Sequence, residues 1–133
     1  MYKIEKNLSG YLLTFSGLIN EAEMQRWVEE STTVLSKESS KSFGVIIDMK
    51  NLHPLDTKTS AIMKNGQKLY KSKGMHRSAV ILNSKDICGQ FKAIASMSGI
   101  YETERYIDAS SVSNPIDVAT KWVKGIADPD KHN

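Results

Sequence analysis

Several features that define particular protein classes are scarce in this chain. It has a single cysteine, Cys88, so no intrachain disulfide can form, and a lone thiol in a small domain is typical of the reducing cytoplasm. Its longest apolar runs, around residues 45–47 and 79–82, are far shorter than the ~20 residues of a membrane-spanning helix. Residues 1–6 carry charges at close intervals, unlike the apolar centre of a signal peptide. We therefore expect a cytoplasmic protein without a membrane span.

The chain also lacks a marked excess of charge of either sign. Its 18 Lys and Arg residues against 15 Asp and Glu residues give a net charge of +3, which is too small and too interspersed to indicate a nucleic-acid partner. The densest basic stretch is Lys64, Lys68, Lys71, Lys73 and Arg77. On a helix such a stretch is usually the solvated face, and an anionic partner is the alternative.

Complete catalytic and metal-binding motifs are missing as well. His53, His76 and His132 fall at unrelated spacings, so no metal site is predicted. Cys88 has no candidate base beside it in sequence, and a packed thiol is a simpler interpretation than a nucleophile. The glycines form neither a Walker loop nor a Gly-x-Gly-x-x-Gly fingerprint. We therefore predict no catalytic residues, no cofactor and no enzymatic activity.

What the chain does have is the composition of one globular domain. Its 133 residues, 40% hydrophobic and 25% charged, suffice for a single hydrophobic core. There is no repeat, low-complexity segment or flexible linker. We assign residues 1–127 to the domain and expect residues 128–133 to form a frayed polar tail.

The first 36 residues predict a β-hairpin and an amphipathic helix. Tyr2 and Ile4 alternate with charged residues, residues 7–10 have turn chemistry, and a strand pattern resumes over residues 11–16. Asn20 then precedes Glu23 at the spacing of a helix cap. The apolar positions that follow recur at helical intervals: Met24, Trp27, Val28, Val34 and Leu35.

Strands alternate with helices over the rest of the chain. Residues 43–48, 78–82 and 104–107 read as strands. Asp56 and Thr57 begin a second helix that ends at Gly74, and Ser84 or Asp86 caps a third helix that ends at Gly99. The apolar stripe of the third helix is Ile87, Phe91, Ile94 and Ala95.

A fourth helix begins at Asn114 and Pro115, and its buried stripe consists of Val118, Ala119, Trp122, Val123 and Ile126. The element order is thus β-β-α-β-α-β-α-β-α. This order predicts an α/β fold with a mostly parallel central sheet, helices packed on it, and an antiparallel first strand. Trp27 and Trp122 each lie on an apolar stripe and should be buried.

Polar residues gather where the predicted parallel strands end. Asp48, Asn83 with Ser84, and Asp108 each follow a strand, and Asp56 begins the next helix. Functional loops of open α/β sheets collect at this edge, because helix N-termini and their free N–H groups meet there. Each residue taken singly is explained by helix capping or a turn. Together they make this edge the candidate site.

Two motifs resemble those of the STAS domain of bacterial anti-sigma-factor antagonists. An aliphatic strand leads through a loop to Asp56 and Thr57 at a helix N-terminus, and a later helix ends in Met97-Ser98-Gly99-Ile100. The resemblance extends to the element order over nearly the whole chain. It implies a single STAS-like domain and a protein-interaction module.

In STAS antagonists the hydroxyl after the Asp is phosphorylated by a partner kinase, which breaks the complex. The resemblance therefore implies Thr57 as a phospho-acceptor and a kinase or regulatory factor as partner. The family's Asp-Ser-Ser-Gly is replaced here by Asp56-Thr57-Lys58-Thr59, without the glycine that lets a partner approach the backbone. Together with the residues at the strand ends, this segment makes up the predicted interaction or anion-binding edge: Asp48, Asp56, Thr57, Lys58, Thr59, Ser60, Asn83, Ser84 and Asp108.

Two functions remain open at this point. A regulatory protein-interaction module requires an exposed edge over residues 56–60 and no large interior void. A carrier of a small or lipidic ligand, suggested by related folds, requires an apolar cavity of about 300 Å³ or more with few polar groups. A homo-oligomer is compatible with either function.

Overall fold

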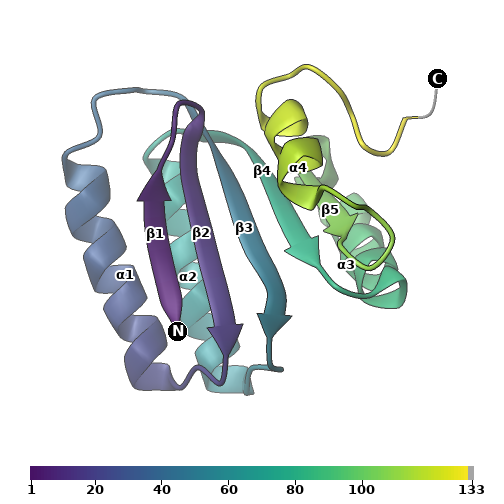
Figure 1. The fold of residues 1–133 in the computed structure, drawn as a ribbon. Coiled ribbons are helices and arrows are strands. Elements are labelled where there is room, and N and C mark those ends of the chain that lie inside the picture. The colour runs from purple at the N-terminus through teal and green to yellow at the C-terminus, as the bar shows by residue number, and fades with distance from the viewer. Residues whose placement is uncertain (132–133) are drawn as a thin grey trace.

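The computed structural model describes residues 1–131, and these residues contain five strands, four α-helices and one short 3-10 helix in the predicted order (Figure 1). His132 lies outside the described residues. The strands are β1 (Tyr2–Lys6), β2 (Gly10–Gly17), β3 (Phe43–Leu52), β4 (Met75–Leu82) and β5 (Glu104–Asp108). The helices are α1 (Glu21–Ser36), α2 (Thr57–Ser72), α3 (Lys85–Ser98), η1 (Ile100–Glu102) and α4 (Pro115–Val123).

All five strands form one sheet in the order β1-β2-β3-β4-β5. β1 pairs antiparallel with β2, and the remaining neighbours are parallel, as the sequence predicts. Because the strand order follows the chain order, successive right-handed crossovers place α1, α2 and α3 on the same face. Figure 1 shows α4 on the opposite face, in front of β4 and β5.

The sheet separates two hydrophobic cores, because side chains alternate between its faces. Val45, Ile47 and Val80 belong to the core under α1 and α2, which is the larger one. Ile46 and Ile81 belong to the core under α4. Trp27 is fully buried in the first core and Trp122 is 4% exposed in the second, which confirms both predictions.

A glycine brings α1 and α2 into close contact. A Cβ atom at Gly66 would lie only 2.1 Å from Cζ3 of Trp27. Only glycine therefore allows α2 to lie this close to the indole. The Trp27 ring stacks on Tyr70 at a centroid distance of 5.9 Å and meets Phe15 edge-on at 5.0 Å. The hydroxyl groups of Ser31 and Tyr70 share a buried hydrogen bond of 2.8 Å.

Several predicted boundaries and stripes are wrong. β3 continues to Leu52, and β4 begins at Met75 instead of residue 78. α4 ends at Val123, followed by Gly125 in a left-handed conformation, so Ile126 lies outside the helix and is 67% exposed. Of the stripe on α3, Ala95 alone is buried.

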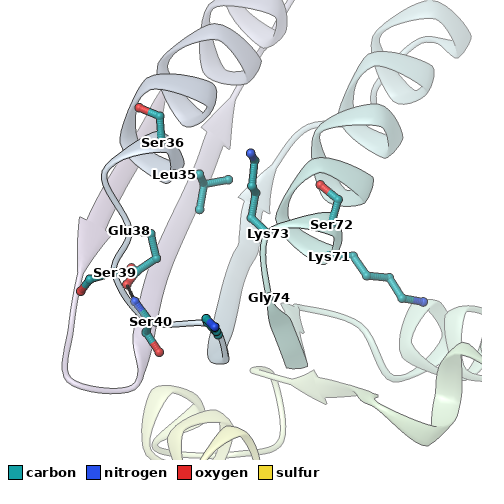
Figure 2. A pocket seen from close by; sticks show the side chains of 10 residues that line it. Leu35, Ser36, Glu38, Ser39, Ser40, Lys71, Ser72, Lys73 and Gly74 are labelled. Carbon is teal, nitrogen blue, oxygen red and sulfur yellow. Dashed lines mark hydrogen bonds between the residues drawn. The ribbon is translucent and has the colours of Figure 1, made fainter.

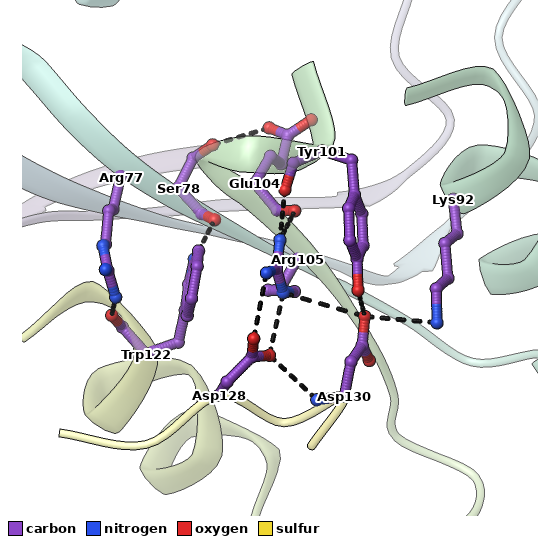
Figure 3. Close-up of polar contacts among 9 residues, drawn as sticks. All are labelled: Arg77, Ser78, Lys92, Tyr101, Glu104, Arg105, Trp122, Asp128 and Asp130. Atoms are coloured by element: carbon purple, nitrogen blue, oxygen red, sulfur yellow. Dashed lines mark hydrogen bonds and ion pairs between the residues drawn. The ribbon is translucent and has the colours of Figure 1, made fainter. Parts of the chain in front are cut away.

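Residues 132–133 of the predicted polar tail lie outside the described residues, but Asp128 and Asp130 are held by contacts with the domain and are not frayed (Figure 3). Asp128 accepts hydrogen bonds of 2.8 and 2.9 Å from Nε and Nη2 of Arg105, which lowers the pKa of Asp128 to about 2. The Arg105 guanidinium is buried between the rings of Tyr101 and Trp122, about 4 Å from each centroid. This arrangement ties Asp128 to β5.

Candidate functional site

The N-terminus of α2 has the local structure that the sequence predicts. The Asp56 carboxylate accepts a hydrogen bond of 2.8 Å from the backbone N–H of Thr59, which caps the helix and lowers the pKa of Asp56. Thr57 occupies the first helical position, and both Thr57 and Lys58 are exposed. Ser60 is half-buried and Thr59 is fully buried, so Thr59 is not part of an accessible edge.

Three of the other predicted edge residues have local partners. Asp48 lies inside β3, is buried, and pairs with Lys50. Ser84 caps α3 by accepting from the N–H of Ile87, and Asp108 accepts hydrogen bonds from Ser110. Asn83 is exposed between β4 and α3. The strand order never reverses, so the sheet has no switch point at which these residues would meet around a crevice.

An apolar groove of about 340 Å³ opens beside the start of α2, between α2, the end of β3 and α3. Its polar lining is limited to His53, Ser60, Lys64 and Gln67. Pro54 and seven further apolar side chains form the rest: Met49, Leu52, Leu55, Met63, Leu82, Ile87 and Phe91. Leu55 and Ser60, which line the groove, lie two residues before and three residues after Thr57 in the sequence.

The groove continues onto an exposed apolar face of α3, which we define as Ile87, Phe91, Ile94 and Met97. Their exposed fractions are 40, 38, 66 and 90%. Phe91 contacts the edge of the Tyr106 ring at a centroid distance of 5.8 Å, and that contact holds the helix over β5. This site was not predictable from the sequence, because helical spacing identifies an apolar stripe without showing whether anything covers it.

The predicted basic stretch divides between two faces of the molecule. Arg77 stacks on the Trp122 ring at 4.0 Å and donates a hydrogen bond of 2.9 Å to the Trp122 carbonyl, on the side of α4. Lys64, Lys68 and Lys71 lie on α2, on the opposite side of the sheet. The stretch is therefore not one basic patch.

A larger, polar hollow of about 510 Å³ lies at the opposite end of the sheet, between the last turns of α1 and α2. Figure 2 shows that the Lys71 and Lys73 side chains there point in different directions. The hydroxyls of Ser36 and Ser72 donate to carbonyls of their own helices, at 2.6 and 2.7 Å. These groups do not converge on a common point, so the hollow has no anion-binding geometry.

The residues that carry reactive groups are dispersed. Burial raises the pKa of the Cys88 thiol to about 11, so Cys88 is a neutral thiol at pH 7. Within residues 1–131, no group of three or more His, Cys, Asp or Glu side chains is placed to hold a metal ion.

None of the helices in this part of the chain has the length and apolarity to cross a membrane.

The sheet order and the helices on its two faces match a STAS-like α/β fold. The structure is similar to that of the anti-sigma factor antagonist SpoIIAA in its unphosphorylated form, with a TM-score of 0.58 and 12% identity over 96% of this chain and 100% of that one. It is equally similar, with a TM-score of 0.58 and 12% identity over 88 and 90% of the two chains, to an uncharacterized DUF3478-family protein with a SpoIIAA-like fold from Shewanella loihica. The sequence matches no family model and no curated protein. At 12% identity these likenesses establish the fold predicted from the sequence.

Proposed function

We propose that this chain is a non-catalytic regulatory module that binds a protein partner through the groove and the adjoining start of α2. The fold supports the proposal, because it is shared with a protein described as an anti-sigma factor antagonist. The apolar surface supports it more directly. Four large apolar side chains exposed along one face of one helix are the kind of surface that soluble proteins bury against a partner.

The observation that carries the proposal is the position of Thr57. Its side chain is exposed, it lies in the first turn of a capped helix, and its neighbours Leu55 and Ser60 line the apolar groove. A group added to this hydroxyl would stand at the rim of the groove. We therefore propose Thr57 as the phospho-acceptor of a switch that releases the partner.

The fold would tolerate a phosphate at this position. Free N–H groups and the helix dipole favour negative charge in the first turn by roughly 0.3 to 1 kcal/mol, and the exposed Lys58 is adjacent. The effect would fall on the partner, because about two negative charges would enter the contact surface. Phosphorylation would thus change binding without unfolding the domain.

The Thr57→Glu substitution tests the proposal, with Thr32→Glu as a control at an exposed threonine of α1. We expect both variants to melt within about 2 °C of the wild type, since surface substitutions usually change stability by less than ~0.5 kcal/mol. A partner retained by the wild type and by Thr32→Glu should be lost from Thr57→Glu. Equal retention by all three proteins would contradict the switch.

A second candidate function is the binding of a small apolar ligand in the same groove. Its volume of about 340 Å³ and its mainly apolar lining support this candidate, and it is an open groove where a carrier was expected to have a cavity. Native mass spectrometry of freshly purified protein separates the two functions. A stoichiometric mass increment of a few hundred daltons, lost on acid denaturation, would favour the carrier over the protein-interaction module.

A further inference from the structure

We propose that the segment docking in the groove is an acidic amphipathic helix of a partner protein. This inference rests on the proposed function and adds to it the chemical character of the partner. It is carried by two independent features of the surface: the spacing of the apolar residues on α3 and the charge of α2.

The exposed apolar residues of α3 form a stripe that a partner helix could lie along. Ile87, Phe91 and Ile94 recur at intervals of four and three residues, so they form a stripe along α3, a helix of 14 residues that is about 21 Å long. Ile87 and Phe91 also line the groove, and Ile94 extends it. A partner helix with apolar residues at matching intervals could lay them along this stripe, as in other helix-in-groove complexes.

The charged feature is a row of lysines on α2. This helix carries Lys58, Lys64, Lys68 and Lys71 and contains no acidic residue. Lys64 lines the groove, and Lys68 follows it one turn later on the same side of α2, whereas Lys71 lies in the last turn, at the polar hollow. Within residues 1–131 none of the four lysines takes part in an ion pair. One wall of the apolar groove is therefore flanked by unpaired positive charge.

The two carboxylates at the adjacent helix starts are fewer than the four lysines of α2. Asp56 is engaged as the cap of α2, and Asp86 lies in the first turn of α3, where the helix dipole accommodates it. Carboxylates along the polar side of a docking helix would complement the lysines and steer the encounter. A phosphate on Thr57 would repel such a helix. Phosphorylation would therefore weaken the binding that the lysines of α2 favour.

A direct test uses a fluorescein-labelled 18-residue peptide as the probe. It carries leucine at intervals of four and three residues and glutamate on its polar face. The matched peptide carries lysine in place of every glutamate. We expect saturable anisotropy with the acidic peptide, binding at least tenfold weaker with the basic one, and amide shift changes confined to α2, α3 and the end of β3.

Single substitutions assign the two features separately. Lys64→Glu should weaken binding of the acidic peptide by about three- to tenfold, whereas Lys41→Glu, at an exposed lysine of the opposite edge, should change it less than twofold. Ile94→Ser should weaken binding by about tenfold or more, and because this side chain is two-thirds exposed the domain should remain folded. Equal effects of Lys64→Glu and Lys41→Glu would show that binding depends on the net charge of the protein and not on the lysine beside the groove, which would overturn the inference.

The outcomes also separate this inference from the proposed function. If the basic peptide binds in the groove as well as the acidic one, the acidic character of the partner is wrong and the protein-interaction module stands. If neither peptide shifts the groove amides and dodecanoate does, the protein-interaction module is wrong and the carrier is supported. Acidic-peptide binding that shifts amides elsewhere on the molecule would also overturn the inference.

Discussion

Replacing Gly66 with alanine should destabilise the domain, although alanine is the better helix former. The substitution gains about 1 kcal/mol in helix propensity. It also places a Cβ atom 2.1 Å from Cζ3 and 2.5 Å from Cη2 of Trp27, so the indole or the helix must move by about 1 Å. Phe15 and Tyr70 pack against the indole, which restricts how far it can move.

The net cost follows from the two opposing effects. Overpacking in a filled core costs about 1–3 kcal/mol and occasionally more, and an overlap of this size against a held aromatic ring belongs at the upper end. After the gain in propensity we expect Gly66→Ala to lower the free energy of unfolding by about 2 kcal/mol. For a domain of this size the melting temperature should fall by about 6–10 °C.

Gly89 provides the matched control, because it lies inside α3 and a Cβ atom added there would have no neighbour within 4 Å. Gly89→Ala should therefore stabilise the domain by up to ~1 kcal/mol. Urea unfolding followed by circular dichroism measures both variants. A Gly66→Ala protein as stable as the wild type would refute the close approach of α2 to Trp27, and so would an unchanged cost in a Trp27→Phe background.

Three further predictions concern the rest of the fold. Trp122→Ala should cost about 3–5 kcal/mol in urea unfolding, because the ring is buried under α4, and an indole that iodide quenches freely in the native wild type would contradict that burial. The hydrogen bond from Lys6 lowers the pKa of Glu38 to about 2, below its unfolded value near 4.3, so this contribution to stability is complete above about pH 4.5 and is lost as the pH falls toward 2. The difference in unfolding free energy between the wild type and Glu38→Gln should therefore be smaller at pH 3 than at pH 7. An equal difference at both pH values would contradict the pairing of Glu38 with Lys6. Asp128→Asn should lower the unfolding free energy by about 1–3 kcal/mol at pH 7, because it replaces the bidentate partner of the buried Arg105 guanidinium and leaves the more distant Asp130 carboxylate, 3.7 Å from Nε, as its ion-pair partner. A loss below about 0.5 kcal/mol would contradict the attachment of Asp128 to β5.

The parts of the fold that depend on local signals were predictable from the sequence. Asn20 and Asp56 cap their helices as expected, because the cap residue and the N–H groups that it accepts from lie within one turn of the same helix. Trp27 and Trp122 are buried because each lies on a helix with a continuous apolar face. The alternation of strands and helices was enough to define the parallel sheet.

The groove could not be predicted in this way, because it depends on the space between α2 and α3. The spacing of Ile87, Phe91 and Ile94 matches that of a buried stripe, and only the placement of α3 over β5 shows that the stripe is uncovered. The attachment of Asp128 to Arg105 joins residues 23 positions apart and leaves no local pattern in the sequence. Tertiary arrangement decided both features.

Site-specific photo-crosslinking in cells tests the central claim most directly. A photoreactive residue would replace Ile94 on the apolar face of α3 and, in a second strain, Lys41 at the opposite edge. The proposed docking site predicts one protein adduct from position 94, no such adduct from position 41, and loss of the adduct when Thr57→Glu is combined with position 94. An adduct formed equally from both positions, or from position 94 whatever residue occupies position 57, would contradict partner binding at the groove under the control of Thr57.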